Sequence, residues 1–358
     1  MTSDSFRETV SAIGPPLLQS LASLERSERN LHPPRIAAEH APRIQCEQAL
    51  RAARDALGET PAPDGLEDFT RELLAASASA LEALALRTGS RGDIAGVLRS
   101  MHLHRRAEAA LYPLRRVLPP ISRFFLEPGA AALVDRLDPD PPSPDSGLHQ
   151  AANAPGERGG FSLYVPESFH ANEPLPLIVA LHGGGGHGAD FLWSWLREAR
   201  SRRCLLLAPT SRGSTWSLMG PDVDTPQLGR MLDFVAGRWP VDTERILLTG
   251  LSDGATFSLL SGLGEQSPFR AIAPLSGVLH PQNAHNGNLD RAAGRRIYLV
   301  HGTLDWMFPI QTARDAARAL REAGAALHYE EVTDLSHTYA REQNARILDW
   351  FGCPLPSS

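Results

Sequence analysis

The chain has 358 residues, of which 42% are hydrophobic and 21% charged, so it is a globular chain long enough for about two domains. Its net charge of -6 is modest and no long block of like charge occurs, which argues against nucleic acid or an anionic membrane surface as a partner. No apolar run approaches the roughly 20 residues of a membrane span, and the polar start lacks a signal-peptide pattern. We therefore expect a cytoplasmic protein.

The pattern of cysteine and histidine residues predicts no metal site. Cys46, Cys204 and Cys353 lie far apart, are odd in number and lack the spacing of a zinc site or a disulfide framework. His102 and His104, two residues apart in a predicted helix, face different directions.

Residues 1–138 have a helical pattern, in which alanine, leucine and arginine dominate and apolar residues recur at spacings of three and four. Asp64 and Glu67 form a capping-box-like start for a helix that ends at Gly89. Further helices are expected over 34–57, 94–111 and 120–133. We expect this region to form a compact helical domain that acts as a lid or as a contact between copies in a homo-oligomer.

Proline and aspartate dominate residues 139–146. Because proline removes backbone donors and acidic side chains favour solvent, this segment is predicted to be an exposed linker between domains.

Residues 147–358 change to a pattern of short apolar runs that alternate with helical stretches. Residues 147–152 and 161–165 are predicted to form a hairpin. Later strands are expected over 176–181, 204–208, 245–251, 271–274, 296–300 and 326–332. Strands that alternate with helices predict an α/β domain with a mostly parallel sheet, whose catalytic groups lie at the carboxyl ends of the strands.

A candidate nucleophile follows the strand that ends at Leu251. The sequence Gly250-Leu251-Ser252-Asp253-Gly254 fits the G-x-S-x-G pattern, in which a serine sits on a sharp turn from strand to helix. The flanking glycines are needed because a side chain at either position would crowd that turn. Ser252 is therefore the predicted nucleophile.

A glycine-rich loop follows the strand that ends at Leu181, with the sequence His182-Gly183-Gly184-Gly185-Gly186. Glycines let backbone N–H groups approach a ligand, so Gly183 and Gly184 are candidates for an oxyanion hole, together with the N–H of Asp253. The alternatives are a flexible turn and a phosphate loop. A phosphate loop is disfavoured because no G-K-[ST] sequence follows and the chain contains no lysine.

Two more loops that follow predicted strands complete a candidate triad. Asp305 is predicted to orient an imidazole, and His337 to act as the general base for Ser252. The chain order of serine, aspartate and histidine matches that of α/β-hydrolases. Asp334 is an alternative partner for His337, and Asp305 could instead be a turn or helix-capping residue. Asp222 and Asp224 are carboxylates outside the predicted triad.

The region from about Gly159 to Gly352 resembles the phospholipase/carboxylesterase family of α/β-hydrolases. The matching segments are 161–166 (FSLYVP), 176–183 (PLIVALHG), 241–246 (VDTERI), 250–254 (GLSDG) and 300–305 (VHGTLD). The resemblance implies an α/β-hydrolase fold and a serine esterase that needs no metal or other cofactor. It implies nothing about the helical region.

Substrate contacts are expected on the same edge of the sheet. Trp216 follows the strand at 204–208 and could line a pocket or anchor its loop, while Trp306 and Met307 could form an apolar wall beside Asp305. The predicted reaction is hydrolysis of small, lipid-like or polymeric esters, with short to medium acyl chains. The alternatives are a thioesterase, a peptidase or a polyester hydrolase, or a scaffold that acts through its helical domain.

Overall fold

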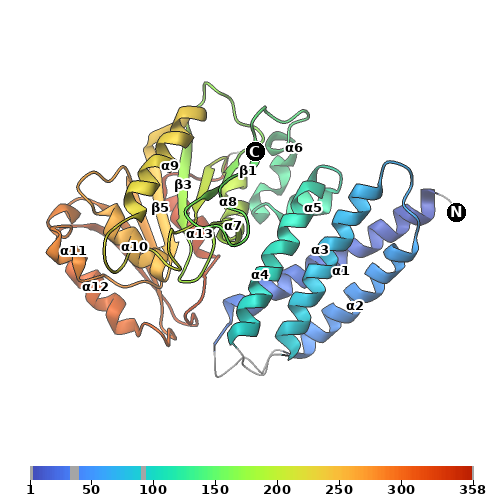
Figure 1. The fold of residues 1–358 in the computed structure, drawn as a ribbon, viewed down its shortest axis with the longest axis horizontal. Helices are drawn as coiled ribbons and strands as arrows, with labels where there is room; N and C mark the ends of the chain where they lie inside the picture. Colours follow the sequence, from blue (N-terminus) through green and yellow to red (C-terminus); the bar gives the residue numbers. More distant parts are fainter. Residues whose placement is uncertain (1–2, 33–39, 90–93, 357–358) are drawn as a thin grey trace. The chain divides into compact units, whose positions relative to one another are not determined.

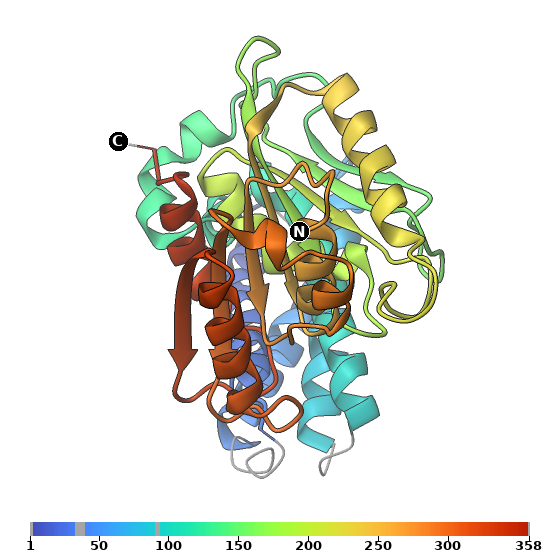
Figure 2. The same ribbon diagram turned by 90° about the vertical axis from the view of Figure 1, so that its left-hand side faces the viewer.

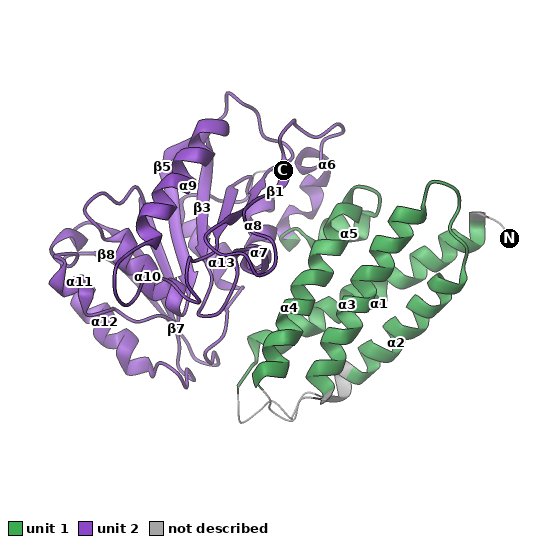
Figure 3. Ribbon diagram, viewed as in Figure 1, with its two compact units in different colours: residues 1–128 green, residues 129–358 purple. Residues whose placement is uncertain are grey.

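The structure is a computed structural model that describes residues 3–32, 40–89 and 94–356. Its internal contacts divide the chain into two compact units, Met1–Pro128 and Gly129–Ser358 (Figure 3). Each unit has its own buried core. No helix in the described ranges is long and apolar enough to cross a membrane.

The first unit is a bundle of helices (Figure 1). Its α-helices are α1 (Ser3–Arg29), α2 (His40–Glu59), α3 (Glu67–Gly89), α4 (Ile94–Leu111) and α5 (Pro119–Phe124). Apolar residues repeat at helical spacing, so that Ile13, Leu17, Leu21 and Leu24 of α1 are all buried. The start predicted at residue 34 lies outside the described residues.

The helix expected over 120–133 is divided in the structure. Helix α5 ends at Phe124, and a 3-10 helix, η3, covers Pro128–Leu133. Pro128 has no backbone N–H and disfavours helical geometry in the residue before it, which explains why one continuous helix does not form.

The second unit contains an eight-stranded sheet with the order β1-β2-β4-β3-β5-β6-β7-β8. The strands are β1 (Gly147–Ala151), β2 (Phe161–Val165), β3 (Leu175–Leu181), β4 (Leu205–Pro209), β5 (Val241–Leu251), β6 (Ala271–Leu275), β7 (Arg296–Gly302) and β8 (Ala326–Val332). β2 pairs antiparallel with β1 and with β4, and the other pairs are parallel. The predicted hairpin and mostly parallel sheet are confirmed.

Helices cover the sheet of the second unit (Figure 1). Those after the short α6 (Val134–Leu137) are α7 (Gly188–Phe191), α8 (Leu196–Ser201), α9 (Asp224–Arg238), α10 (Asp253–Gly262), α11 (Gln282–His285), α12 (Ile310–Glu322) and α13 (Gln343–Phe351). Leu177 and Val179 of β3 share a core with Leu228 and Val235 of α9. Helix α12 packs beside β7 and β8 (Figure 2). Helices α8 and α13 are joined by Asn344, which donates to the Glu198 carboxylate at 3.1 Å.

The division between the units falls before the segment that was predicted to be the linker. Residues 139–146 belong to the second unit and are bonded to it. The amide of Ser143 donates to the carbonyl of Glu167 at 2.9 Å, and Trp239 donates its indole N–H to the carbonyl of Asp145 at 3.0 Å. Composition alone did not indicate these contacts, because they depend on partners distant in sequence.

Candidate active site

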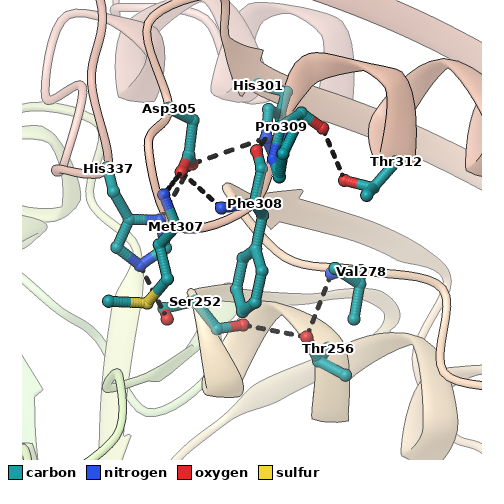
Figure 4. Close-up of polar contacts among 10 residues, drawn as sticks. All are labelled: Ser252, Thr256, Val278, His301, Asp305, Met307, Phe308, Pro309, Thr312 and His337. Carbon is teal, nitrogen blue, oxygen red and sulfur yellow. Dashed lines mark hydrogen bonds and ion pairs between the residues drawn. The ribbon is translucent and has the colours of Figure 1, made fainter.

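Ser252 sits at the junction of β5 and α10 in a strained backbone conformation. Its φ is 56° and its ψ is -118°, a region that non-glycine residues rarely adopt. Its amide donates to the carbonyl of Leu275 in β6 at 3.0 Å, and its carbonyl accepts from the amide of Thr256 at 2.9 Å. The hydroxyl of Thr256 in turn accepts the amide of Val278 at 3.0 Å (Figure 4). The surrounding chain therefore holds the turn on both sides of the serine.

The glycines on either side of Ser252 are required by close backbone contacts. A Cβ at Gly250 would lie 2.5 Å from the carbonyl carbon of Gly254. A Cβ at Gly254 would lie 2.4 Å from the carbonyl oxygens of Leu181 and His182. Real Cβ atoms do not approach backbone so closely, so the sharp turn that exposes the serine hydroxyl depends on both glycines.

His337 and Asp305 extend from Ser252 in a chain of hydrogen bonds (Figure 4). The Nε2 of His337 lies 3.0 Å from the Oγ of Ser252, and its Nδ1 lies 2.8 Å from Oδ2 of Asp305. The three residues come from the loops after β5, β7 and β8, whose carboxyl ends meet at one edge of the parallel sheet. This arrangement can move a proton from the serine to an imidazole whose orientation is fixed by a carboxylate.

The carboxylate of Asp305 is buried and held by its own loop. Its Oδ1 accepts from the amides of Met307 at 2.9 Å and Phe308 at 2.8 Å, which leaves Oδ2 directed at His337. The ring of Phe308 meets the ring of His337 edge-on, at 5.2 Å between centroids.

A second histidine, His301, lies behind Asp305. Its Nε2 donates to the Phe308 carbonyl at 2.8 Å and lies 3.4 Å from Oδ2 of Asp305. Burial lowers the pKa of His301, so the ring is neutral and serves to hold the loop. Sequence reasoning missed Phe308 and His301 as supporting residues, although both belong to the loop sequence that contains Asp305.

The glycine loop lies against the nucleophile turn. A Cβ at Gly183 would come 3.5 Å from Cβ of Ser252, and one at Gly184 would come 2.6 Å from Oδ2 of Asp253. The amide of Gly185 donates to the carbonyl of Ser214 at 2.8 Å. The loop thus lies against the serine turn, and a side chain at Gly184 would require the Asp253 carboxylate to move.

His182 fixes the start of this loop. Its Nε2 accepts from the amide of Ser211 at 3.1 Å, and its Nδ1 lies 2.7 Å from the carbonyl of Gly183. This pairing requires a neutral ring with the proton on Nδ1. Burial lowers the pKa of His182 to about 4, which keeps the ring neutral near pH 7.

Arg158 supports the other end of the glycine loop and was missed by sequence reasoning. It donates through one terminal nitrogen to the Gly186 carbonyl at 2.7 Å and through Nε to the Ser211 carbonyl at 3.1 Å. It lies between β1 and β2, far from the loop in sequence, so no local signal indicated this role.

Residues 227–350 match the profile of the phospholipase/carboxylesterase family. The match extends over the part of the chain from α9 to α13. The chain is therefore a serine hydrolase of the carboxylesterase type.

Individual relatives are distant from this chain. A probable feruloyl esterase C of Aspergillus oryzae is 27% identical over 206 residues, which cover 55% of this chain and 72% of the relative. A bifunctional acetylxylan esterase/xylanase of Neocallimastix patriciarum is 24% identical over 53% of this chain and 28% of the relative. A crystal structure of a thermostable esterase has 18% sequence identity and a TM-score of 0.46, covering 57% of this chain and 62% of the other.

The three residues expected to bind substrate in this carboxylesterase lie in different environments. Trp216 is only 3% exposed, donates its indole N–H to the His182 carbonyl at 2.7 Å and stacks on Phe257. Of the two roles considered for Trp216, the structure favours that of a loop anchor, because the side chain is enclosed. Trp306 and Met307 are 49% and 46% exposed, and the Trp306 ring lies 6.4 Å from the His337 ring.

The other carboxylates considered for the carboxylesterase site have different positions. The imidazole of His337 forms its hydrogen bond with Asp305. Asp334, the alternative partner considered for His337, is exposed. Asp224 is buried and accepts from the amides of Arg212 and Ser217 at 2.9 and 2.8 Å, so it shapes the loop that contains Trp216.

His104 of the helical unit is part of a network of side chains within the protein. His104 is buried on α4 and lies 2.7 Å from Glu28 of α1, which also pairs with Arg105 at 2.6 Å. In the described part of the chain, no group of three or more histidine, cysteine or acidic side chains is placed to hold a metal ion.

Proposed function

We propose that the chain hydrolyses carboxylic esters through Ser252, His337 and Asp305 as a catalytic triad. The observation that carries this proposal is the pair of hydrogen bonds, 3.0 and 2.8 Å long, that links the three side chains at the carboxyl edge of the sheet. The strained backbone at Ser252 supports it, because strain of this kind is typical of a nucleophile presented on a sharp turn.

In the first step, His337 takes the hydroxyl proton of Ser252 at Nε2 as the serine Oγ attacks the ester carbonyl carbon. The Nδ1–H of the resulting imidazolium donates to Asp305, whose negative charge stabilises it. The tetrahedral intermediate then collapses, the bond to the alcohol oxygen breaks, and His337 gives its proton to the departing alcohol. An acyl-serine remains.

In the second step, His337 takes a proton from water as the water oxygen attacks the acyl carbon. Collapse of this second intermediate returns the proton to Ser252 and releases the carboxylic acid. In both steps the negative oxygen is stabilised by the backbone N–H groups of Gly184 and Asp253, with Gly183 shaping the approach. The closeness of Gly183 and Gly184 to the serine turn supports this assignment.

We propose small carboxylic esters with short to medium acyl chains as substrates. The half-exposed Trp306 beside His337 offers an aromatic surface at the reaction centre. Distant relatives are named feruloyl and acetylxylan esterases. Esters of aromatic acids and of acetic acid are therefore the substrates to compare first.

The test is hydrolysis of p-nitrophenyl esters from acetate to palmitate, together with methyl ferulate. Ser252→Ala and His337→Ala should each lower kcat by roughly 10⁴-fold or more, and Asp305→Asn should also lower kcat strongly. The acyl-length profile of the wild type then reports the size of the acyl pocket. Matched thioesters and amides test the thioesterase and peptidase alternatives.

Ser276→Ala is the matched control. Ser276 is also a buried serine with a positive φ, of 52°, and its hydroxyl has no hydrogen-bond partner in the described structure. It should keep wild-type kinetics. Equal activity of Ser252→Ala and the wild type would exclude Ser252 as the nucleophile.

A further inference from the structure

The residue after the nucleophile, Asp253, places a carboxylate beside the reaction centre. Its Oδ2 accepts from the hydroxyl of Thr215 at 2.6 Å and lies so close to Gly184 that a Cβ there would be 2.6 Å away. Asp253 is half-buried, so the carboxylate lies between the glycine loop and solvent.

The charge of Asp253 is not neutralised by a cation. In the described part of the chain, its one hydrogen-bonding side chain is Thr215, a neutral donor, and no arginine or histidine pairs with it. The other carboxylate of the site, that of Asp305, is fully buried and accepts hydrogen bonds from the N–H groups of His337, Met307 and Phe308. Asp253 is therefore the carboxylate whose field reaches a bound substrate.

A carboxylate here is unfavourable for the reaction of a neutral or anionic ester. The proposed oxyanion lies near the amide of Asp253 and the glycine loop, so its negative charge would develop close to Oδ2, and like charges repel. A cationic group on the substrate would instead be attracted. Asp253 also begins α10, where a negative side chain stabilises the helix, but that role alone does not require the contact with Gly184.

We propose that Asp253 is a specificity-determining residue that makes the site favour esters carrying a positive charge and reject esters carrying a negative charge. This inference rests on the proposed function, because it places the substrate at Ser252. Thr215 donates a hydrogen bond to the carboxylate, and Gly184 leaves room for it.

The experiment measures kcat/KM for two series of esters of equal shape. In the first series, phenyl acetate carries a meta trimethylammonium, tert-butyl or sulfonate group. In the second, the same three groups end the acyl chain of a p-nitrophenyl butanoate. The two series report charge on the alcohol side and on the acyl side separately.

Asp253→Asn keeps the shape and the capacity to accept from Thr215 but removes the charge. We expect it to lower the ratio of cationic to anionic kcat/KM by about tenfold in at least one series, as expected for unit charges several ångströms apart near a protein surface. Thr215→Val should keep the wild-type preference. In the wild type, ~0.5 M salt should reduce the same ratio, a result that does not depend on the folding of a variant.

Glu265→Gln is the matched control, because it removes one exposed negative charge just beyond the other end of α10. It should leave the ratio unchanged. The inference is overturned if Asp253→Asn lowers kcat/KM equally for all three esters of each series, or if it leaves the ratio of cationic to anionic kcat/KM unchanged in both series. If the wild type hydrolyses none of the esters, the proposed function itself fails, and the inference fails with it.

Discussion

At Ser252 and its two glycine neighbours, the proposed function depends on close contacts between backbone atoms. The turn is held by hydrogen bonds to β6 and α10, and glycine is needed where two stretches of main chain nearly touch. The sequence predicted this crowding at Gly250 and Gly254 from the motif alone. It could not predict that Gly254 would meet Leu181 and His182, because these residues lie at the end of β3 and just after it, far from the motif in sequence.

Gly254→Ala tests this crowding. The new methyl group would meet the carbonyl oxygens of Leu181 and His182 at 2.4 Å, so we expect a loss of ~2–3 kcal/mol in the free energy of unfolding. Gly237→Ala is the control: it lies in α9 with nothing within 4 Å, and should gain ~0.5–1 kcal/mol. Urea unfolding measures both, and an unchanged midpoint for Gly254→Ala would contradict the packing described here.

His182 makes stability depend on pH. Burial lowers its pKa in the folded chain to about 4, below the value of 6.5 usual for histidine, so the unfolded chain binds a proton more readily between these values. The stabilisation is fully present above pH 6.5 and is lost as the pH falls toward 4. The loss amounts to ~3 kcal/mol, the free-energy equivalent of this pKa difference.

The measurement is urea unfolding of the wild type and His182→Gln at several pH values between 4 and 7. The variant should lose less stability than the wild type over this range. His285→Gln, a change at an exposed histidine of α11, should follow the wild type. If the free energy of unfolding changed with pH in the same way for His182→Gln and the wild type, the pKa of His182 would not be lowered by folding.

At the scale of elements, the candidate active site is built by loops that follow β3, β5, β7 and β8. These loops were predictable, because strands that alternate with helices form a parallel sheet whose carboxyl ends share one edge. The support from Arg158 was not predictable, since it comes from the hairpin of β1 and β2. The enclosed position of Trp216 also depends on packing against α10, which a sequence pattern does not report.

Trp216 and Trp306 should therefore differ when changed. Trp216→Phe removes the hydrogen bond to the His182 carbonyl, so the glycine loop shifts and kcat should fall roughly tenfold for every ester. Trp306→Ala removes an exposed ring beside His337, so KM should rise about fivefold for aromatic esters and less for acetate. Steady-state kinetics separates the two effects, and a selective KM effect of Trp216→Phe would instead place Trp216 in the substrate pocket.

At the scale of the whole molecule, the change from helical to alternating pattern was visible in the sequence, whereas the position of the boundary was not. The unit that contains the candidate active site begins at Gly129. Residues before β1 contribute to it through partly buried contacts: the Arg200 guanidinium pairs with Asp138, and Trp239 donates to Asp145. Composition marked 139–146 as exposed because proline and aspartate prefer solvent, but partners distant in the chain hold this segment in place.

Two fragments test this boundary. A fragment that begins at Gly147 lacks Asp138, Ser143 and Asp145, and it thereby loses the carboxylate of Asp138 that pairs with the buried Arg200. It should be at least ~3 kcal/mol less stable than a fragment that begins at Gly129, measured by chemical unfolding. Equal stability of the two fragments would mean that residues 129–146 are a linker after all.

The fragment that begins at Gly129 also tests the role proposed for the helical unit. If that unit is a lid or an oligomer contact, its removal should change kcat/KM for long-chain esters or the mass in solution. Both are measured against the full chain, by kinetics and by light scattering. A fragment with unchanged kinetics and mass would require another role for the helices.

The most direct test of the proposed triad is labelling with a fluorophosphonate, followed by mass spectrometry of the labelled peptide. The wild type should carry one adduct on Ser252, Ser252→Ala should carry none, and His337→Ala should react far more slowly because its serine lacks a base. Labelling of Ser252→Ala at the wild-type rate, or an adduct on another residue of the wild type, would contradict the assignment of Ser252 as the nucleophile.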